Sequence, residues 1–138
     1  MKINFDHISL RAKNPSEMKN FLIELLDFEI GFRPDFPFEG YWLYSGKKDV
    51  VHIFNEQATF YKKGLIKENI EEESTGKNIV NHVCFYSDDY EELMARIRKM
   101  NLDYSINLVP DCSIEQIFIN APENLILEIQ AIPKDKKE

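Results

Sequence analysis

The pattern of hydrophobic and polar residues occurs twice along the chain, in the same order. In the first half, a β-like run over residues 2–10 precedes a segment whose apolar residues recur every three or four positions, as on one face of a helix. Asn14, with Glu17 three residues later, is a typical helix start, because the two side chains cap free backbone N–H groups. Two strands are then expected over 41–44 and 50–54, on either side of a turn.

The second half repeats this order. Residues 79–86 form a β-like run, and Asp88 with Glu91 is predicted to open a second amphipathic helix. The two predicted caps, Asn14 and Asp88, occupy the same place in each half, which indicates an internal duplication. The remaining strands are expected over 102–109, 115–119 and 125–129.

Length and composition predict one domain. The chain has 138 residues, of which 43% are hydrophobic, enough for a single core. This single domain, 1–138, is expected to contain two modules, the first over about 1–60 and the second over about 79–131. A connector is expected between them, over about 61–78, and a disordered tail after them, over 132–138.

Charge and hydropathy exclude several classes of protein. A formal net charge of -7 opposes binding to nucleic acid or to an anionic membrane. No apolar run reaches the ~18 residues of a membrane span, and the N-terminus has a strand pattern instead of the apolar core of a signal peptide. A cytoplasmic protein is expected, with Cys84 and Cys112 as free thiols because their spacing fits no metal or redox motif.

The three histidines add candidate chemistry to the duplicated pattern. The number of residues from His7 to His82 is almost the same as the number from His52 to Glu128. The two predicted helix caps are separated by nearly the same number of residues. Each of the four lies in a β-like run, so each half could contribute two ligands to one metal ion. Two imidazoles and a carboxylate can hold a divalent cation on one side and leave positions open for substrate.

These residues also have simpler interpretations. A single histidine on a strand is more often hydrogen-bonded or at the surface than bound to metal. Glu128 interrupts an apolar run, where a carboxylate facing the core would need a partner, although it could also face outward on a half-exposed strand. His52 could be a fourth ligand or could support a ligand by hydrogen bonding.

Several segments carry a resemblance to a known family. They are the strands DHISL and NHVCF, the helices NPSEMKNFLIELLDF and DDYEELMARIRKM, and the closing QIFINAPENLILEIQ. Together they resemble the glyoxalase/bleomycin-resistance/dioxygenase family, or vicinal oxygen chelate superfamily, over residues 3–131. The resemblance implies an α+β fold in which two βαβββ modules form a curved, mostly antiparallel sheet around a metal cavity. It also implies a homodimer and metal ligands at His7, His52, His82 and Glu128.

The resemblance implies an enzyme whose substrate binds a divalent metal, Fe, Zn, Mn or Ni, through two neighbouring oxygens. A lyase, an isomerase or a ring-cleaving dioxygenase would fit, and Glu128 is the one carboxylate placed at the site to move a proton. True glyoxalase I is not expected, because that enzyme usually has a glutamate where this chain has His52. The alternative is a metal-free homodimer that sequesters an antibiotic, since the chain is acidic and rich in aromatic residues.

Aromatic residues are concentrated between Phe28 and Tyr44. They could belong to the core or to a dimer interface. They could also line a cavity for an apolar small-molecule substrate, together with residues of the later strands. The candidate substrate-binding residues are Tyr41, Trp42, Tyr44, Phe54, Gln116 and Phe118.

Overall fold

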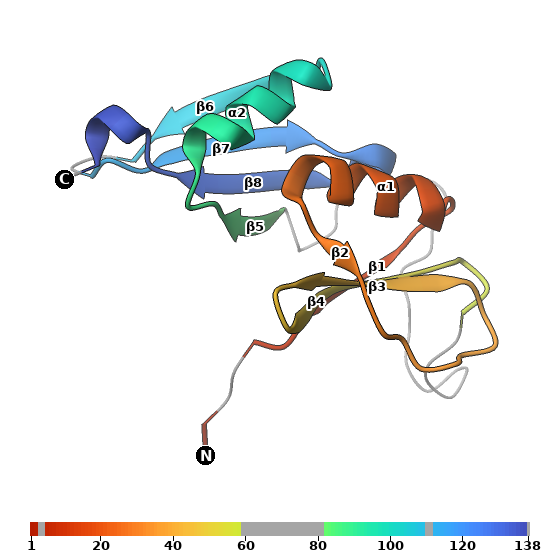
Figure 1. Ribbon diagram of the computed structural model, residues 1–138. Coiled ribbons are helices and arrows are strands. Elements are labelled where there is room, and N and C mark those ends of the chain that lie inside the picture. The colour runs from red at the N-terminus through yellow and green to blue at the C-terminus, as the bar shows by residue number, and fades with distance from the viewer. Residues whose placement is uncertain (3–4, 59–81, 110–111, 138) are drawn as a thin grey trace.

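The computed structural model describes residues 1–2, 5–58, 82–109 and 112–137. It confirms a small α+β fold made of two similar βαβββ modules, one after the other along the chain (Figure 1). All of the predicted connector, 61–78, lies outside the described residues, as do the first residues of the strand predicted over 79–86.

The strands form two separate four-stranded sheets, one in each module, where one curved sheet was expected. The first sheet has the order β1-β4-β3-β2, with β1 parallel to β4 and the other neighbours antiparallel. Module one consists of β1 (Ile8–Arg11), α1 (Pro15–Leu26), β2 (Glu29–Ile30), β3 (Gly40–Ser45) and β4 (Lys48–Phe54).

The second sheet repeats this topology as β5-β8-β7-β6, with β5 parallel to β8. Module two consists of β5 (Val83–Tyr86), α2 (Tyr90–Lys99), β6 (Tyr104–Leu108), β7 (Glu115–Asn120) and β8 (Ile126–Ala131), with short 3-10 turns at Pro122–Asn124 and Lys134–Lys136.

The helix starts follow the predicted chemistry, with one correction. The Asn14 side chain accepts a hydrogen bond of 3.1 Å from the Glu17 N–H, as expected. The second helix is capped by Asp89, which accepts from the Glu92 N–H, and the predicted cap Asp88 is wrong by one residue. The Ser87 hydroxyl accepts from the Asp89 N–H, which extends the preceding turn. With this correction, the interval between the two caps along the chain equals that between His7 and His82.

The first strand begins later than predicted. β1 starts at Ile8 and pairs with Val51, although the sequence pattern places its start at residue 2. The register between β3 and β4 shifts at Leu43 and Tyr44, so Val50 has no partner in β3. Such a β-bulge bends its strand. The parallel ladder with β1 begins just after this bulge, which leaves His7 immediately before the strand.

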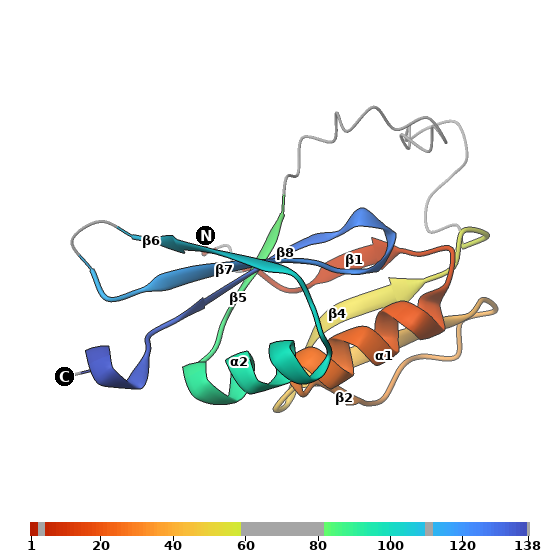
Figure 2. The ribbon, with the colours of Figure 1, turned by 90° about the horizontal axis from the view of Figure 1, so that it is seen from above.

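The two modules share one hydrophobic core between the helices and the inner faces of the sheets. The helices lie on the same side of the molecule in Figure 2. A second link joins the β7–β8 turn to the start of α1, where the Glu123 carboxylate accepts from the backbone N–H groups of Lys13 at 2.7 Å and Asn14 at 3.2 Å. The largest fully buried side chains are Leu22, Leu25, Leu43, Val51, Ile53, Ile97, Ile117, Ile119, Leu127 and Ile129.

The described part of the predicted tail contains a 3-10 turn at Lys134–Lys136. The Lys134 N–H donates to Glu91 on α2, and the Lys137 ammonium donates to the Asp88 carbonyl. Within the described ranges, no helix is long and apolar enough to cross a membrane.

Candidate functional site

The sheet registers place the four candidate ligands at equivalent positions of the two modules. His52 on β4 is opposite Ser9 on β1, and Glu128 on β8 is opposite Cys84 on β5. His7 and His82 each come two residues before those partners. Since alternate side chains of extended backbone point to the same face, each module gathers its two candidate ligands on one side of its own sheet.

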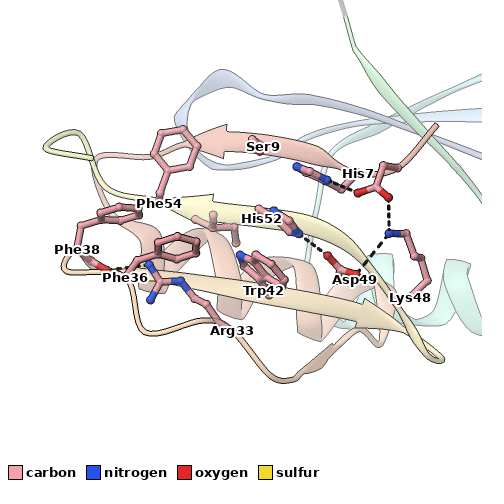
Figure 3. A pocket seen from close by; sticks show the side chains of 12 residues that line it. His7, Ser9, Arg33, Phe36, Phe38, Trp42, Lys48, Asp49, His52 and Phe54 are labelled. Carbon is pink, nitrogen blue, oxygen red and sulfur yellow. Dashed lines mark hydrogen bonds and ion pairs between the residues drawn. The ribbon is translucent and has the colours of Figure 1, made fainter. Parts of the chain in front are cut away.

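The first pair is held by two carboxylates and a lysine. The His7 and His52 rings are stacked, with centroids 3.7 Å apart. His7 Nδ1 lies 2.6 Å from Asp6, and His52 Nε2 lies 2.6 Å from Asp49. Lys48 bridges the two aspartates at 2.8 and 3.4 Å, so the five side chains form one continuous network (Figure 3).

The charges of this network determine which imidazole nitrogens carry protons. The hydrogen bond from His7, and to a smaller extent that from Lys48, lowers the pKa of Asp6 to about 2. The hydrogen bond from His52 lowers the pKa of Asp49. Both carboxylates are therefore charged and can only accept, so His7 Nδ1 and His52 Nε2 are the protonated atoms. Burial lowers the pKa of His52, which leaves a neutral ring with a lone pair on Nδ1.

The β-bulge explains why Asp49 and His52 can meet. Residues three apart on a regular strand point to opposite faces. The bulge at Val50 inserts one extra residue between them, which turns Asp49 to the side of His52. The alternation of residue types does not reveal this contact, and Asp49 was not among the predicted site residues.

The second pair is centred on a buried carboxylate. Glu128 is only 4% exposed, and its two oxygens accept hydrogen bonds from the side-chain amides of Gln116 at 3.1 Å and Gln130 at 3.2 Å. His82 Nε2 lies 3.8 Å from Glu128 Oε1. The His82 ring also meets the Phe118 ring edge to face, with centroids 5.8 Å apart.

The donor atoms of this second pair suit a divalent ion. Two donors that each bind an ion at about 2.1 Å lie roughly 3 to 4 Å apart for bond angles of about 90° to 130°. The 3.8 Å between His82 Nε2 and Glu128 Oε1 falls in this range. Within the described part of one chain, no three His, Cys, Asp or Glu side chains form a group that could hold a metal. The four predicted ligands lie as two pairs, one in each module.

A cavity of about 740 Å³ lies over the first sheet, beside the His7–His52 pair (Figure 3). The Trp42 ring stacks on His52, with centroids 3.9 Å apart and planes 4° from parallel. The cavity volume is typical of a site for a small molecule. The lining residues are Asp6, His7, Ser9, Arg33, Phe36, Phe38, Trp42, Lys48, Asp49, His52, Ile53 and Phe54.

The six candidate substrate-binding residues are distributed over four places. Trp42 and Phe54 line the cavity. Tyr41 packs against the hydrophobic core beneath Lys19 of α1. Tyr44 donates a hydrogen bond of 2.6 Å to the Phe32 carbonyl and is not among the cavity residues. Gln116 and Phe118 lie on the second sheet, beside Glu128 and His82.

Arg33, Phe36 and Phe38 line the cavity but were not predicted as site residues. They belong to the segment between β2 and β3, where strand alternation gives no information about direction. The signal that could have found them is the concentration of aromatic residues between Phe28 and Tyr44.

Comparison with known proteins identifies the fold. No protein-family model and no curated protein sequence matches the chain. Among solved structures, lactoylglutathione lyase from Agrobacterium tumefaciens has a TM-score of 0.65 at 15% identity, covering 93% of this chain and 92% of that chain. The chain has the glyoxalase fold.

Two further structures share the glyoxalase fold. A genomically encoded fosfomycin resistance protein from Listeria monocytogenes has a TM-score of 0.64 at 14% identity and covers 100% of both chains. An integron cassette protein from V. cholerae has a TM-score of 0.68 at 15% identity, covering 95% of this chain and 97% of that one. The predicted vicinal oxygen chelate fold is confirmed. At such identities the likeness shows the fold alone.

Proposed function

We propose that this chain is a divalent-metal-dependent enzyme whose small substrate binds the metal through two neighbouring oxygens, in a reaction of the lyase, isomerase or ring-cleaving dioxygenase type. The observation that carries this proposal is the environment of Glu128. This buried carboxylate is oriented by two amides, and within the described part of the chain its ion-pair partner is His82. Hydrogen-bond donors that orient a carboxylate in this way are typical of metal ligands.

His7, His82 and Glu128 would hold the ion. Asp6 accepts a hydrogen bond from His7 Nδ1, which fixes the ring and leaves Nε2 as the atom that would bind the ion. His52, held by Asp49 and stacked between Trp42 and His7, would be a fourth ligand or would support His7. The bound metal would supply positive charge next to the substrate oxygens. Glu128 is also the carboxylate we propose as the acceptor of a substrate proton.

A homodimer would bring the two pairs together. One chain places His7 and His52 on the first sheet, and His82 and Glu128 on the second sheet. In a symmetric dimer, the first sheet of one chain can face the second sheet of its partner, and the same contact occurs twice. Each metal site would then contain a pair from each chain.

Metal-dependent turnover tests the enzymatic proposal. Metal-loaded protein should convert a member of a panel of catechols and thiol adducts of 2-oxo aldehydes, and chelation should abolish that activity. Glu128→Gln should lose both bound metal and turnover. The matched control is Glu115→Gln, because Glu115 is also a buried carboxylate but is bonded to Tyr90 and Lys136. Metal retained by Glu128→Gln, or turnover unaffected by chelation, would contradict the proposal.

The rival proposal is a metal-free homodimer that holds a planar cationic antibiotic. The aromatic lining of the cavity, with Asp6 and Asp49, supports it. Arg33 in the same lining opposes a cationic ligand. Tight binding of such an antibiotic by chelator-treated protein, with no metal uptake, would favour the rival.

A further inference from the structure

The cavity contains a guanidinium group whose charge has no carboxylate partner among the described residues. Arg33 lies in the segment between β2 and β3, and no ion pair in the described ranges involves it. Its guanidinium is 5.2 Å from the ring centroids of both Phe36 and Phe38. One terminal nitrogen donates a hydrogen bond of 2.8 Å to the Phe38 carbonyl. The side chain is partly buried, so its position is fixed while other N–H donors remain available.

The other cation of the cavity is in a different situation. Lys48 is paired with Asp6 at 2.8 Å and with Asp49 at 3.4 Å, so nearby carboxylates neutralise its charge. The cavity is therefore polarised, with the two aspartates and the histidine pair at one end and the uncompensated charge of Arg33 at the other (Figure 3).

A row of aromatic rings connects these two ends. Phe36 and Trp42 have centroids 6.5 Å apart, and Trp42 lies 3.9 Å from His52. His52 in turn lies 3.7 Å from His7. These rings provide apolar surface against which a flat substrate can pack.

The backbone at Gly40 keeps Arg33 in place. A Cβ atom on Gly40 would lie 2.9 Å from an Arg33 guanidinium nitrogen and 2.5 Å from the Ile53 carbonyl oxygen. Any larger residue at this position would displace the guanidinium or the strand. The close approach of the side chain to β3 therefore depends on a residue without a side chain.

We propose that Arg33 determines specificity by binding an oxyanion of the substrate, a carboxylate or a phosphate-type group, whose apolar planar body lies along the aromatic row. Arginine suits this role because its planar N–H groups match two oxygens of such an anion. As a statement about substrate class, the inference rests on the proposed function. The contact itself involves protein and anion alone, so it can be measured without metal.

Fluorescence of Trp42 gives a direct readout, because it is the only tryptophan of the chain and lines the cavity. Chelator-treated full-length protein is titrated with 3-phenylpropionate, 2-phenylethylphosphonate and the neutral 3-phenylpropanamide. At least one anion should bind about tenfold or more tightly than the amide, as expected for charged hydrogen bonds. The preferred anion identifies the carboxylate or phosphate-type class. Equal affinities for all three probes would overturn the proposal.

Variants assign this preference to a residue. Arg33→Gln should bind the amide as before and lose the preference for the anion, whereas Arg33→Lys should retain part of it. In Lys47→Gln, which removes an exposed charge outside the cavity lining, the preference should remain. A preference that survives in Arg33→Gln, or that is lost in Lys47→Gln as well, would overturn the proposal. If Arg33→Gln fails to fold, an undiminished preference in Arg33→Lys overturns it and a reduced one supports it.

Metal content distinguishes this inference from the proposed function. Arg33→Gln should bind as much metal as the unmutated protein, because Arg33 belongs to neither ligand pair. An anion preference without metal binding would support the Arg33 site and contradict the metalloenzyme. Metal binding without an anion preference would support the metalloenzyme and contradict the Arg33 site.

Discussion

Two buried carboxylates on adjacent strands of the second sheet illustrate how local partners determine a residue's role. Glu115 on β7 accepts a hydrogen bond of 2.9 Å from the Tyr90 hydroxyl and lies 3.5 Å from the Lys136 ammonium. Glu128 on β8 is bonded to amides and faces His82. A carboxylate with a lysine partner is neutralised within the fold, whereas one oriented by amides retains charge for a cation. We therefore interpret Glu115 as structural and Glu128 as the functional group.

The pKa of Tyr90 provides a test of the Glu115 contact. Burial, and to a smaller extent the hydrogen bond to Glu115, raises the pKa of Tyr90 from 10.0 to about 12. The folded state therefore holds the phenol proton more tightly than the unfolded state does. The stability that protonated Tyr90 contributes is complete below pH 10 and is lost as the pH rises toward 12. Tyr90→Phe should be less stable at neutral pH, and this deficit should shrink over the alkaline range.

Thermal unfolding from about pH 9 to about pH 12 measures the deficit. Tyr86→Phe is the control, because Tyr86 is 60% exposed, and its melting temperature should follow that of the unmutated protein. A constant difference between Tyr90→Phe and the unmutated protein across this range would contradict the assignment.

At the scale of elements, local patterns predicted most helices and strands. One error arose at a local turn and another where the pairing of strands decided. Asn14 caps α1 as expected, because a capping box is a short-range interaction. The start of α2 was misplaced by one residue, since the Ser87 hydroxyl extends the preceding turn. The bulge at Val50 could not be predicted, because it depends on the pairing of three strands and not on residue type.

The β7–β8 turn contains a residue whose conformation needs tertiary support. Glu123 has φ of 60°, in the left-handed region that disfavours most side chains. Its carboxylate offsets this cost by accepting two backbone N–H groups at the start of α1. The sequence shows that glycine is missing from this turn, but it gives no indication of the distant contact that compensates.

Removing this contact should loosen the link between the modules. Glu123→Ala should lower the free energy of unfolding by about 1 to 2 kcal/mol, because two N–H groups lose a charged acceptor. Glu123→Gln keeps an acceptor oxygen and should lose less. Urea unfolding measures both variants. Equal stability of Glu123→Ala and the unmutated protein would show that the contact contributes nothing.

At the scale of the whole molecule, the candidate site could be predicted from the sequence because the chain contains an internal duplication. Nearly equal intervals along the chain pair His7 with His82 and His52 with Glu128, and the sheet registers place both sets at equivalent positions. The arrangement of the two pairs on separate sheets depends on packing between modules, about which these intervals say nothing. Arg33 was not predicted for a more local reason: it lies between β2 and β3, where strand alternation gives no direction, and Phe36, Phe38 and Gly40 set the course of its side chain.

The central claim is that one ion is shared by a pair from each module, with the two pairs in different chains. The most direct test is the metal stoichiometry of His7→Ala and Glu128→Ala, each alone and after the two are unfolded together and refolded as a mixture. Each variant alone should bind almost no metal. The mixture should recover about a quarter of the sites, because half of the dimers are mixed and each has one intact site. Metal retained by either variant alone, or no recovery in the mixture, would contradict the claim.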